Sequence, residues 1–344
     1  MISSQVTSES FKQIKVAIDE SSCFNADLCM KILLNFKELI NFEQCNIEPI
    51  LFSYGALPIK KPWPELDKFL DPNWLKEMTK NIYPHSVKIL PPHIFNWETY
   101  TDLSRSQYLS FYTHITHTDL VIVMDDFKKK FFNFFNLHFS ELLCLESKIP
   151  VIVSQPNIRS NQKISNIMYL TFFPGSPNFS QEYDEFKNIL KIAKKLNAKL
   201  TIFYKFIKKT KNYFFSAEII SGTGIPFYDP GLMMERNSHL KTISQWFKIA
   251  KQEGVLVDIK IGKDDPNSLE DEILQTQIEG NYDLISFDPK DIKYLKLSSL
   301  SSSCPIYVAR FPFQSSCYDA LENIKDYITH AKYAAYSTST NGSV

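Results

Sequence analysis

Short runs of apolar residues recur along the chain, and the same order of runs is found twice. Each copy has an opening run, a continuous apolar run and a closing run with a proline near its start: 14–18, 120–123 and 149–153, then 167–172, 284–287 and 303–308. The copies are offset by roughly 150 residues, the size of a domain rather than of a solenoid repeat. The pattern therefore predicts two copies of one domain in tandem.

The spacing of apolar residues within each copy predicts alternating strands and helices. The expected strands are 14–18, 50–52, 87–90, 120–124 and 151–153, then 167–172, 200–206, 255–261, 284–287 and 306–309. The expected helices are 27–40, 73–81, 100–115 and 131–146, then 180–196, 232–253 and 268–279. Prolines between residues 55 and 72 predict a long loop, and Pro91 with Pro92 is expected to end the third strand.

Alternation of strand and helix is typical of a parallel sheet covered by helices on both faces. The expected fold class is therefore α/β, with two tandem doubly wound parallel-sheet domains packed as a pseudo-dimer. The first domain is expected at 12–155 and the second at 165–312. Residues 313–344 are expected to hold a C-terminal helix, near 319–333, and a disordered tail.

Composition and charge make some classes of function less favoured for this chain. The 344 residues include 38 basic and 38 acidic side chains, and this balance does not favour a nucleic-acid or membrane partner. No apolar run approaches the roughly 18 residues of a membrane span, and residues 1–10 lack the apolar stretch of a signal peptide. The six cysteines form no CxxC pair, which is typical of free thiols in a reducing compartment. A cytoplasmic location is expected.

The order of elements and several short motifs resemble the universal stress protein family, whose members also occur as tandem two-domain chains. The opening strand ends in Asp19, and the first copy reads Asp119-Leu120-Val121-Ile122-Val123 before Ile149-Pro150-Val151-Ile152-Val153. The second copy reads Tyr282-Asp283-Leu284-Ile285 before Ser303-Cys304-Pro305-Ile306-Tyr307-Val308. The resemblance covers most of both copies. It implies, in each, a five-stranded parallel sheet of the adenine-nucleotide α-hydrolase-like type.

The resemblance also implies how the copies meet. Related closing strands mediate dimers in that family, and an unpaired edge strand needs to be covered. The closing strands 151–153 and 306–308 are therefore the expected contact edges of an intramolecular pseudo-dimer. A homodimer of the whole chain stays an open alternative.

ATP-binding members of the family carry a loop patterned G-x2-G-x9-G-[ST] after the fourth strand, where glycines let backbone N–H groups approach phosphate. In the first copy the glycine positions hold Met124, Phe127 and Leu137, and the hydroxyl position holds His138. The second copy is markedly shorter in this segment, and the chain has only 9 glycines. No cofactor is therefore expected, and ATP binding by the first copy is kept as the alternative.

Asp19 is the one candidate cofactor-binding residue. It ends the opening strand, where open α/β sheets bind ligands, and the resemblance implies a place near the adenine or ribose. Its counterpart in the second copy is Phe172. The other interpretation is that Asp19 caps the following helix together with Ser21 or Ser22.

His114, His117 and Asp119 form a candidate metal cluster, because histidines three residues apart on a helix can share an ion. However, no second ligand pair accompanies them, and Asp119 matches Asp283, which has no histidine nearby. Surface histidines at a helix end are the favoured interpretation, and no metal is expected.

Lys128-Lys129-Lys130 is followed by Phe131-Phe132-Asn133-Phe134-Phe135. A basic run with aromatic residues can bind single-stranded nucleic acid, and exposed aromatic clusters mark protein interfaces. A solvated turn before a buried helix face is the simplest interpretation. A partner-binding surface comes next, because the segment replaces a ligand loop.

Two further features are expected to be structural. Ser221-Gly222-Thr223-Gly224 reads as a flexible loop, because a GxG sequence alone is weak evidence for a phosphate site. Cys304 precedes Pro305 at the start of a buried strand and is expected to be an inert core residue. No Ser-His-Asp, Cys-His or carboxylate pair can be proposed from spacing, so the protein is not expected to be an enzyme.

These observations favour a non-catalytic cytoplasmic regulatory protein of stress-response type, which resembles a tandem universal stress protein that has lost its phosphate-loop motifs. It is expected to act through contacts with an unknown protein partner. The alternative is an adenine-nucleotide binding protein with an altered site in the first copy. A weak hydrolase of that nucleotide is a third hypothesis, for which the sequence shows no general base.

Overall fold

The computed structural model describes the greater part of both copies. The described residues are 10–19, 24–40, 42, 44–54, 64–80, 88–97, 102–124, 139–155, 163–172, 179–207, 230–263, 269–295 and 304–308. In the sequence, the two copies lie before and after residues 156–162. They are called the first half and the second half.

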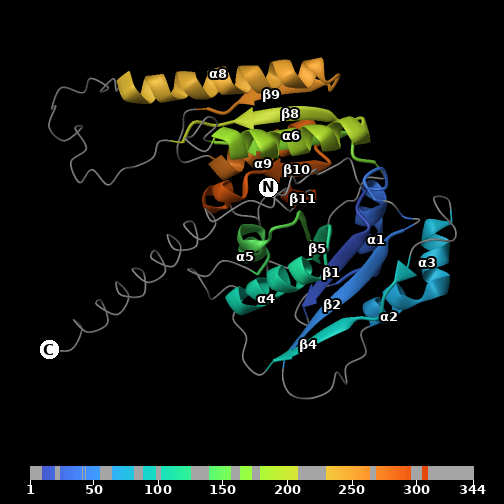
Figure 1. The fold of residues 1–344 in the computed structure, drawn as a ribbon. Helices are drawn as coiled ribbons and strands as arrows, with labels where there is room; N and C mark the ends of the chain where they lie inside the picture. Colours follow the sequence, from blue (N-terminus) through green and yellow to red (C-terminus); the bar gives the residue numbers. More distant parts are fainter. Residues whose placement is uncertain are drawn as a thin grey trace, which may run out of the picture.

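Within the described ranges, strands from both halves form a single 11-stranded sheet (Figure 1). The strands of the first half are β1 Gln13–Asp19, β2 Asn46–Tyr54, β3 Lys88–Ile89, β4 His93–Trp97, β5 Leu120–Met124 and β6 Val151–Ser154. The strands of the second half are β7 Asn166–Thr171, β8 Lys199–Tyr204, β9 Val257–Ile261, β10 Leu284–Phe287 and β11 Ile306–Val308.

The sheet order is β3-β2-β1-β5-β6-β11-β10-β7-β8-β9, with β4 also beside β2. Each half therefore places its strands in the same relative order, and the printed pairings within each half are parallel. This confirms the expected α/β fold with a doubly wound parallel sheet in each copy. The residue boundaries of the two domains stay predictions.

The closing strands β6 and β11 join the halves. They pair antiparallel, with Tyr307 opposite Ile152, Ile306 opposite Val153 and Val308 opposite Val151. All residues of β6 and β11 are buried, so neither strand is left as an open edge. The expectation that the closing strands form the contact between the copies is confirmed.

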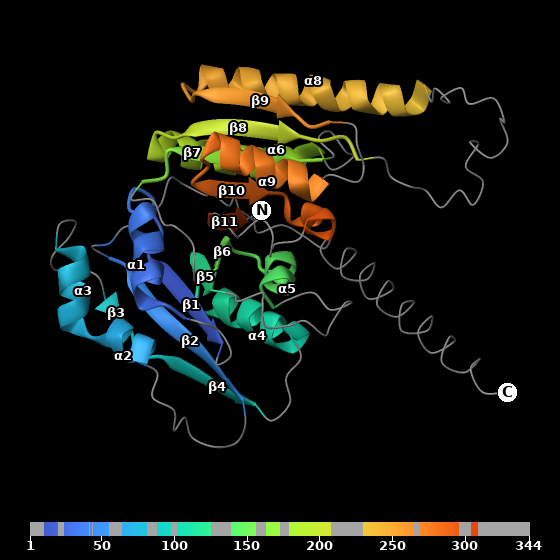
Figure 2. The same ribbon diagram turned by 180° about the vertical axis from the view of Figure 1, so that it is seen from behind.

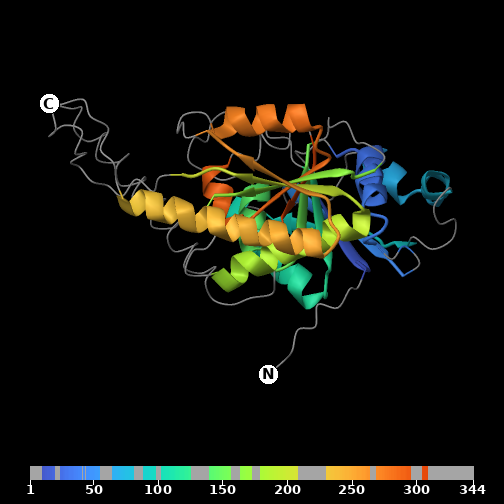
Figure 3. The ribbon, with the colours of Figure 1, turned by 90° about the horizontal axis from the view of Figure 1, so that it is seen from above.

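Helices cover both faces of the sheet (Figure 2). They are α1 Ala26–Asn35, α2 Pro64–Leu70, α3 Pro72–Thr79, α4 Asp102–Ile115 and α5 Phe139–Glu146 in the first half, and α6 Phe179–Leu196, α8 Pro230–Gln252, α9 Leu269–Gly280 and the 3₁₀ helix η3 Pro289–Tyr294 in the second. Buried side chains of α1, α2, α6 and α8 belong to one apolar cluster, and those of α4, α5, α9 and η3 to another. Figure 3 shows α8 and α9 on opposite sides of the second-half strands.

Both apolar clusters extend across the seam between β6 and β11. On one face, the ring of Phe36, which follows α1, stacks on Tyr307 of β11 with centroids 6.2 Å apart. On the other face, α5 of the first half packs against η3 of the second. The two halves therefore share their cores as well as their sheet.

The proline-based predictions between residues 55 and 97 were wrong in one place and incomplete in another. Residues 64–70 form α2, because Pro64 occupies the first turn of the helix, where its missing N–H costs nothing. The third strand ends at Ile89, before Pro91 and Pro92, as expected. The prediction lacked β4, which follows the prolines; β3 and β4 both pair with β2.

The other differences are small. Helix α1 ends at Asn35 rather than Ile40, and Ile40 instead forms an isolated parallel bridge with Phe11. The described part of the predicted helix 131–146 is α5, and residues 131–138 lie outside the described residues. The predicted helix 319–333 and the predicted tail also lie outside them.

The shared core predicts that the halves unfold together. Replacement of Tyr307 by alanine removes a ring that is 3% exposed, and should lower the free energy of unfolding by about 3 to 5 kcal/mol. Urea unfolding, followed by circular dichroism and by tryptophan fluorescence, should give one coincident transition at a lower midpoint. Two separated transitions in the wild-type chain would contradict a shared core.

The Tyr307→Phe variant is the matched control, because it keeps the ring. Burial raises the pKa of the Tyr307 phenol, so the unfolded chain releases this proton first as the pH rises. The wild-type protein should therefore lose stability above a pH of about 10, and Tyr307→Phe should lose less.

Candidate functional site

The sheet order places one switch point in each half. Strands β1 and β5 are neighbours in the first half, and β7 and β10 are neighbours in the second. The chain leaves these strands toward opposite sides of the sheet, and open α/β sheets bind ligands at the carboxyl ends of strands at such a point. These two carboxyl edges are the candidate functional sites.

In the first half, Asp19 is the last residue of β1 and lies opposite Phe52 of β2. The neighbouring strand β5 ends at Met124, which is buried. The structure therefore places Asp19 at the expected carboxyl edge. Whether its carboxylate touches a ligand or caps α1 stays a prediction, because residues 20–23 and 125–138 lie outside the described residues.

In the second half, apolar side chains of the chain itself occupy the switch point. Phe172 follows β7 and Phe287 ends β10, and both rings are buried. The 3₁₀ helix η3 comes directly after Asp288, and Ile292 and Leu295 pack in the same apolar cluster as the two rings. The apolar side chains described at this edge are thus buried within the protein.

A buried ion pair lies next to this edge, at the end of β8. Lys205 Nζ is 2.9 Å from Glu272 Oε2, and the two side chains are 3% and 16% exposed. Glu272 Oε1 also accepts the backbone N–H of Lys263 at 2.7 Å. A Cβ at Gly262 would lie 3.2 Å from Glu272 Oε2, so glycine lets the chain after β9 approach the pair. The Glu272 carboxylate therefore ties α9 to the ends of β8 and β9.

The structure does not bring His114, His117 and Asp119 together as a metal centre. Both histidines are exposed at the end of α4, which confirms the helix-end interpretation. His117 has a left-handed backbone, with φ +48°, and Asn281 has φ +45° at the equivalent place after α9. His117 thus takes the helix-ending position that Asn takes in the other half.

Asp119 has a structural role, and Asp283 repeats it. Asp119 Oδ2 accepts the backbone N–H groups of Lys12 and Gln13, both at 2.8 Å. Asp283 Oδ2 accepts those of Ser165 and Asn166, at 2.8 and 3.0 Å. Each carboxylate therefore ties the start of the opening strand to the strand beside it.

Among the described residues, no three His, Cys, Asp or Glu side chains are grouped so that they could hold a metal ion. No described helix is long and apolar enough to cross a membrane. Cys304 is 2% exposed, and its sulfur accepts a hydrogen bond from Gln277 Nε2 at 3.2 Å. The expectation of a core cysteine is confirmed.

Two sequence candidates lie outside the described residues. They are the Lys128–Phe135 segment and Ser221–Gly224. Their roles stay predictions.

Sequence reasoning missed a polar cluster between the sheet and α4. Lys15 and Glu48 face each other on β1 and β2 and form an ion pair, and the Tyr112 hydroxyl donates to Glu48 Oε1 at 2.9 Å. Burial, together with Glu48, raises the pKa of the Tyr112 phenol. The cluster lies toward the amino ends of the strands, away from both switch points, and so fixes α4 rather than a ligand. The sequence feature that could have indicated this cluster is Lys15, a lysine inside an otherwise apolar run.

Comparisons with solved structures agree with this architecture. A universal stress protein from Archaeoglobus fulgidus DSM 4304 matches with a TM-score of 0.53 at 14% identity, over 88% of this chain and 98% of that chain. A functionally unknown protein from Pseudomonas aeruginosa PAO1 matches with a TM-score of 0.51 at 8% identity, over 94% and 99%. No family model matches the sequence, and no curated protein matches it either. The fold is thus that of a universal stress protein, with both halves included in one match.

The paired carboxylates give a test of the equivalence of the two halves. Asp119→Ala and Asp283→Ala each leave two backbone N–H groups without their acceptor, and each should lower the free energy of unfolding by about 1 to 3 kcal/mol. Urea denaturation measures both.

The control is Asp258→Ala, which removes an exposed carboxylate paired with Lys199 and should change stability by less than about 1 kcal/mol. An effect at Asp119 without a similar effect at Asp283 would refute the proposed equivalence.

Proposed function

We propose that the protein is a non-catalytic, cytoplasmic regulatory protein of stress-response type, which acts through contacts with other proteins. The closed switch point of the second half carries the proposal. Phe172 and Phe287 are buried at the carboxyl ends of β7 and β10, and Ile292 and Leu295 belong to the same apolar cluster, whereas a bound nucleotide would need open backbone N–H groups at this edge. The universal stress protein fold supports the stress-response type.

The sequence of the first half supports the same function. Bulky residues stand at the glycine positions of the phosphate-loop pattern, among them Met124 at the end of β5. A side chain at such a position keeps the backbone from approaching a phosphate group.

Two largely buried carboxylates near the sheet also fit a non-catalytic protein. Glu48 pairs with Lys15, and Glu272 pairs with Lys205. A general base has to be within hydrogen-bond reach of substrate and free to take its proton. These two carboxylates instead tie elements of the fold together.

The alternative function is binding of an adenine nucleotide by the first half. The position of Asp19 at the end of β1, beside β5, favours it. In this alternative the carboxylate would contact the ribose or adenine, and an altered loop would hold the phosphates.

Titration calorimetry with ATP and magnesium separates the two functions. We expect no binding heat at millimolar ATP from the wild-type protein, from Asp19→Ala, or from the control Asp258→Ala, which alters an exposed carboxylate on β9. A thermal melt should likewise show no stabilisation, whereas ligand at 100 times its dissociation constant would add about 2.7 kcal/mol.

Micromolar binding that survives in Asp258→Ala and is lost in Asp19→Ala would overturn the proposal in favour of the nucleotide function. Binding retained in both variants would overturn it as well and would move the site away from Asp19.

The protein-contact part of the proposal has its own test. A photo-crosslinking amino acid at Phe134, within the Phe-rich segment, should give a discrete crosslinked species in cells, and excess wild-type protein should compete with it. The same amino acid at Phe111, an exposed position on α4, is the control. Equal crosslinking at both positions, or none at Phe134, would contradict a partner surface there.

A further inference from the structure

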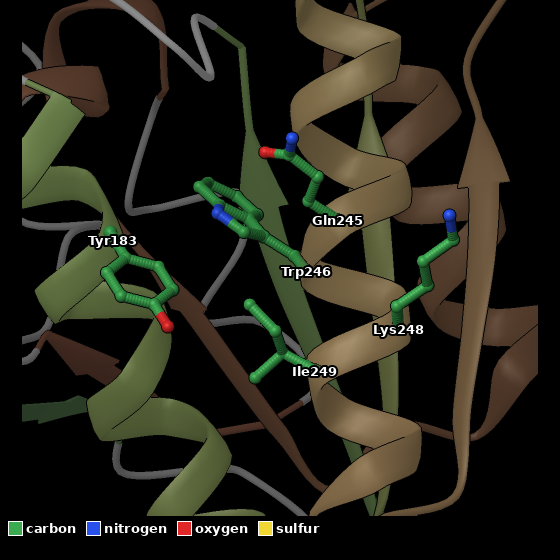
Figure 4. A pocket seen from close by; sticks show the side chains of 5 residues that line it. All are labelled: Tyr183, Gln245, Trp246, Lys248 and Ile249. Carbon is green, nitrogen blue, oxygen red and sulfur yellow. The ribbon is translucent and has the colours of Figure 1, made fainter.

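An apolar pocket lies between α6 and α8, on the outer helical layer of the second half (Figure 4). Tyr183 of α6 lines one side, and Gln245, Trp246, Lys248 and Ile249 of α8 line the other. Its volume is about 330 Å³, at the lower end of the range of small-molecule sites. None of the residues that line the pocket is used in the argument for the proposed function.

The Trp246 indole is held rigidly at this pocket. Its ring stacks on Phe186 of α6, with centroids 4.8 Å apart and planes 8° apart, and it lies 6.1 Å from the ring of Tyr169 on β7. Trp246 is only 1% exposed. Because α6, α8 and the sheet all fix the ring, the direction of its N–H bond is set before any ligand arrives.

The indole nitrogen of Trp246 is buried and has no hydrogen-bond partner. Figure 4 shows this nitrogen on the side of the ring that faces Tyr183, toward the pocket. A buried tryptophan N–H usually finds an acceptor, and leaving it unpaired is costly. Trp74 shows the ordinary case, since its Nε1 donates to Asp27 Oδ1 at 3.2 Å.

The charge beside the pocket favours an anion. Lys187 Nζ lies 4.2 Å from the centroid of the Tyr183 ring, so one cation lies beside a ring that lines the pocket. The stem of Lys248 belongs to the lining, and its ammonium group points away from Trp246 (Figure 4). The site thus offers one fixed donor, an apolar surface at Ile249 and Tyr183, and a nearby positive charge.

We propose that this pocket binds a small apolar carboxylate. One carboxylate oxygen accepts the Trp246 Nε1–H, and the hydrocarbon part lies against Ile249 and the Tyr183 ring. The Lys187 ammonium stabilises the negative charge. The function is separate from the proposed protein contacts and does not depend on them.

Nuclear magnetic resonance of the indole N–H groups tests the proposal directly. The chain has 4 tryptophans, and Trp246→Phe and Trp74→Phe assign two of their signals in ¹⁵N-labelled protein. Octanoate should shift the Trp246 signal saturably, in the direction of a new hydrogen bond. The Trp74 signal should stay in place, because its N–H already has an acceptor.

Two further probes separate the contributions of the ligand. Octan-1-ol keeps the chain and an acceptor oxygen but lacks the charge, and it should bind more weakly than octanoate. Octylammonium has no acceptor and should leave the Trp246 signal unchanged.

Variants locate the binding. Trp246→Phe removes the donor and should weaken octanoate binding, measured by calorimetry, roughly tenfold. Lys187→Met should weaken it severalfold, and Trp74→Phe should not change it. Ile249→Glu places a carboxylate in the lining and should abolish binding. Ile249 is only partly buried, so this variant keeps the test valid if Trp246→Phe unfolds.

Three results would overturn the proposal. One is an unshifted Trp246 signal at millimolar octanoate in folded protein. Another is an equal shift with octylammonium, which cannot accept the N–H. The third is a Trp246 signal that depends on protein concentration without any ligand, since a second copy of the chain would then cover the pocket.

Discussion

The antiparallel pairing of β6 with β11 is the constraint on which the rest of the structure depends. A parallel five-strand order leaves one closing strand at the edge of each half, and a buried apolar edge strand cannot remain open to water. Pairing Ile152 with Tyr307 satisfies both edges at once. It also brings the helical layers of the two halves together, so that Phe36 packs on Tyr307 and α5 on η3. One sheet, rather than two touching domains, is the result.

The two halves share the contacts that fix the starts of their opening strands, but they differ at the carboxyl edges of the sheet. Asp119 and Asp283 bind the starts of the opening strands in the same way, and His117 and Asn281 end the preceding helices with the same backbone. These are requirements of the fold and apply to both copies. The carboxyl edges carry no such requirement, which allows Asp19 in one half and Phe172 in the other.

The strands were predictable from the sequence because buried parallel strands are continuous apolar runs; the run at 284–287 coincides with β10. The end of β1 at Asp19 was predictable for the same reason. α2 and β4 were missed because a proline's effect depends on its position: it starts a helix as readily as it breaks a strand. The pocket at Trp246 could not be predicted from the sequence. Helical spacing places an apolar side chain inside, but only the packing of α6 against α8 decides whether its N–H meets an acceptor.

The position of the seam has a consequence for synthesis on the ribosome. β6 ends at Ser154 and its partner β11 begins at Ile306, so the first half is complete long before its partner strand exists. At the usual rates of translation, about 5 to 20 residues per second, the edge of β6 waits on the order of ten seconds. During that wait the open edge of β6 can pair with another exposed strand, such as the β6 of a second nascent chain. Fast folding of the second half, or a chaperone bound at this edge, then decides between one continuous sheet and an entangled pair of chains.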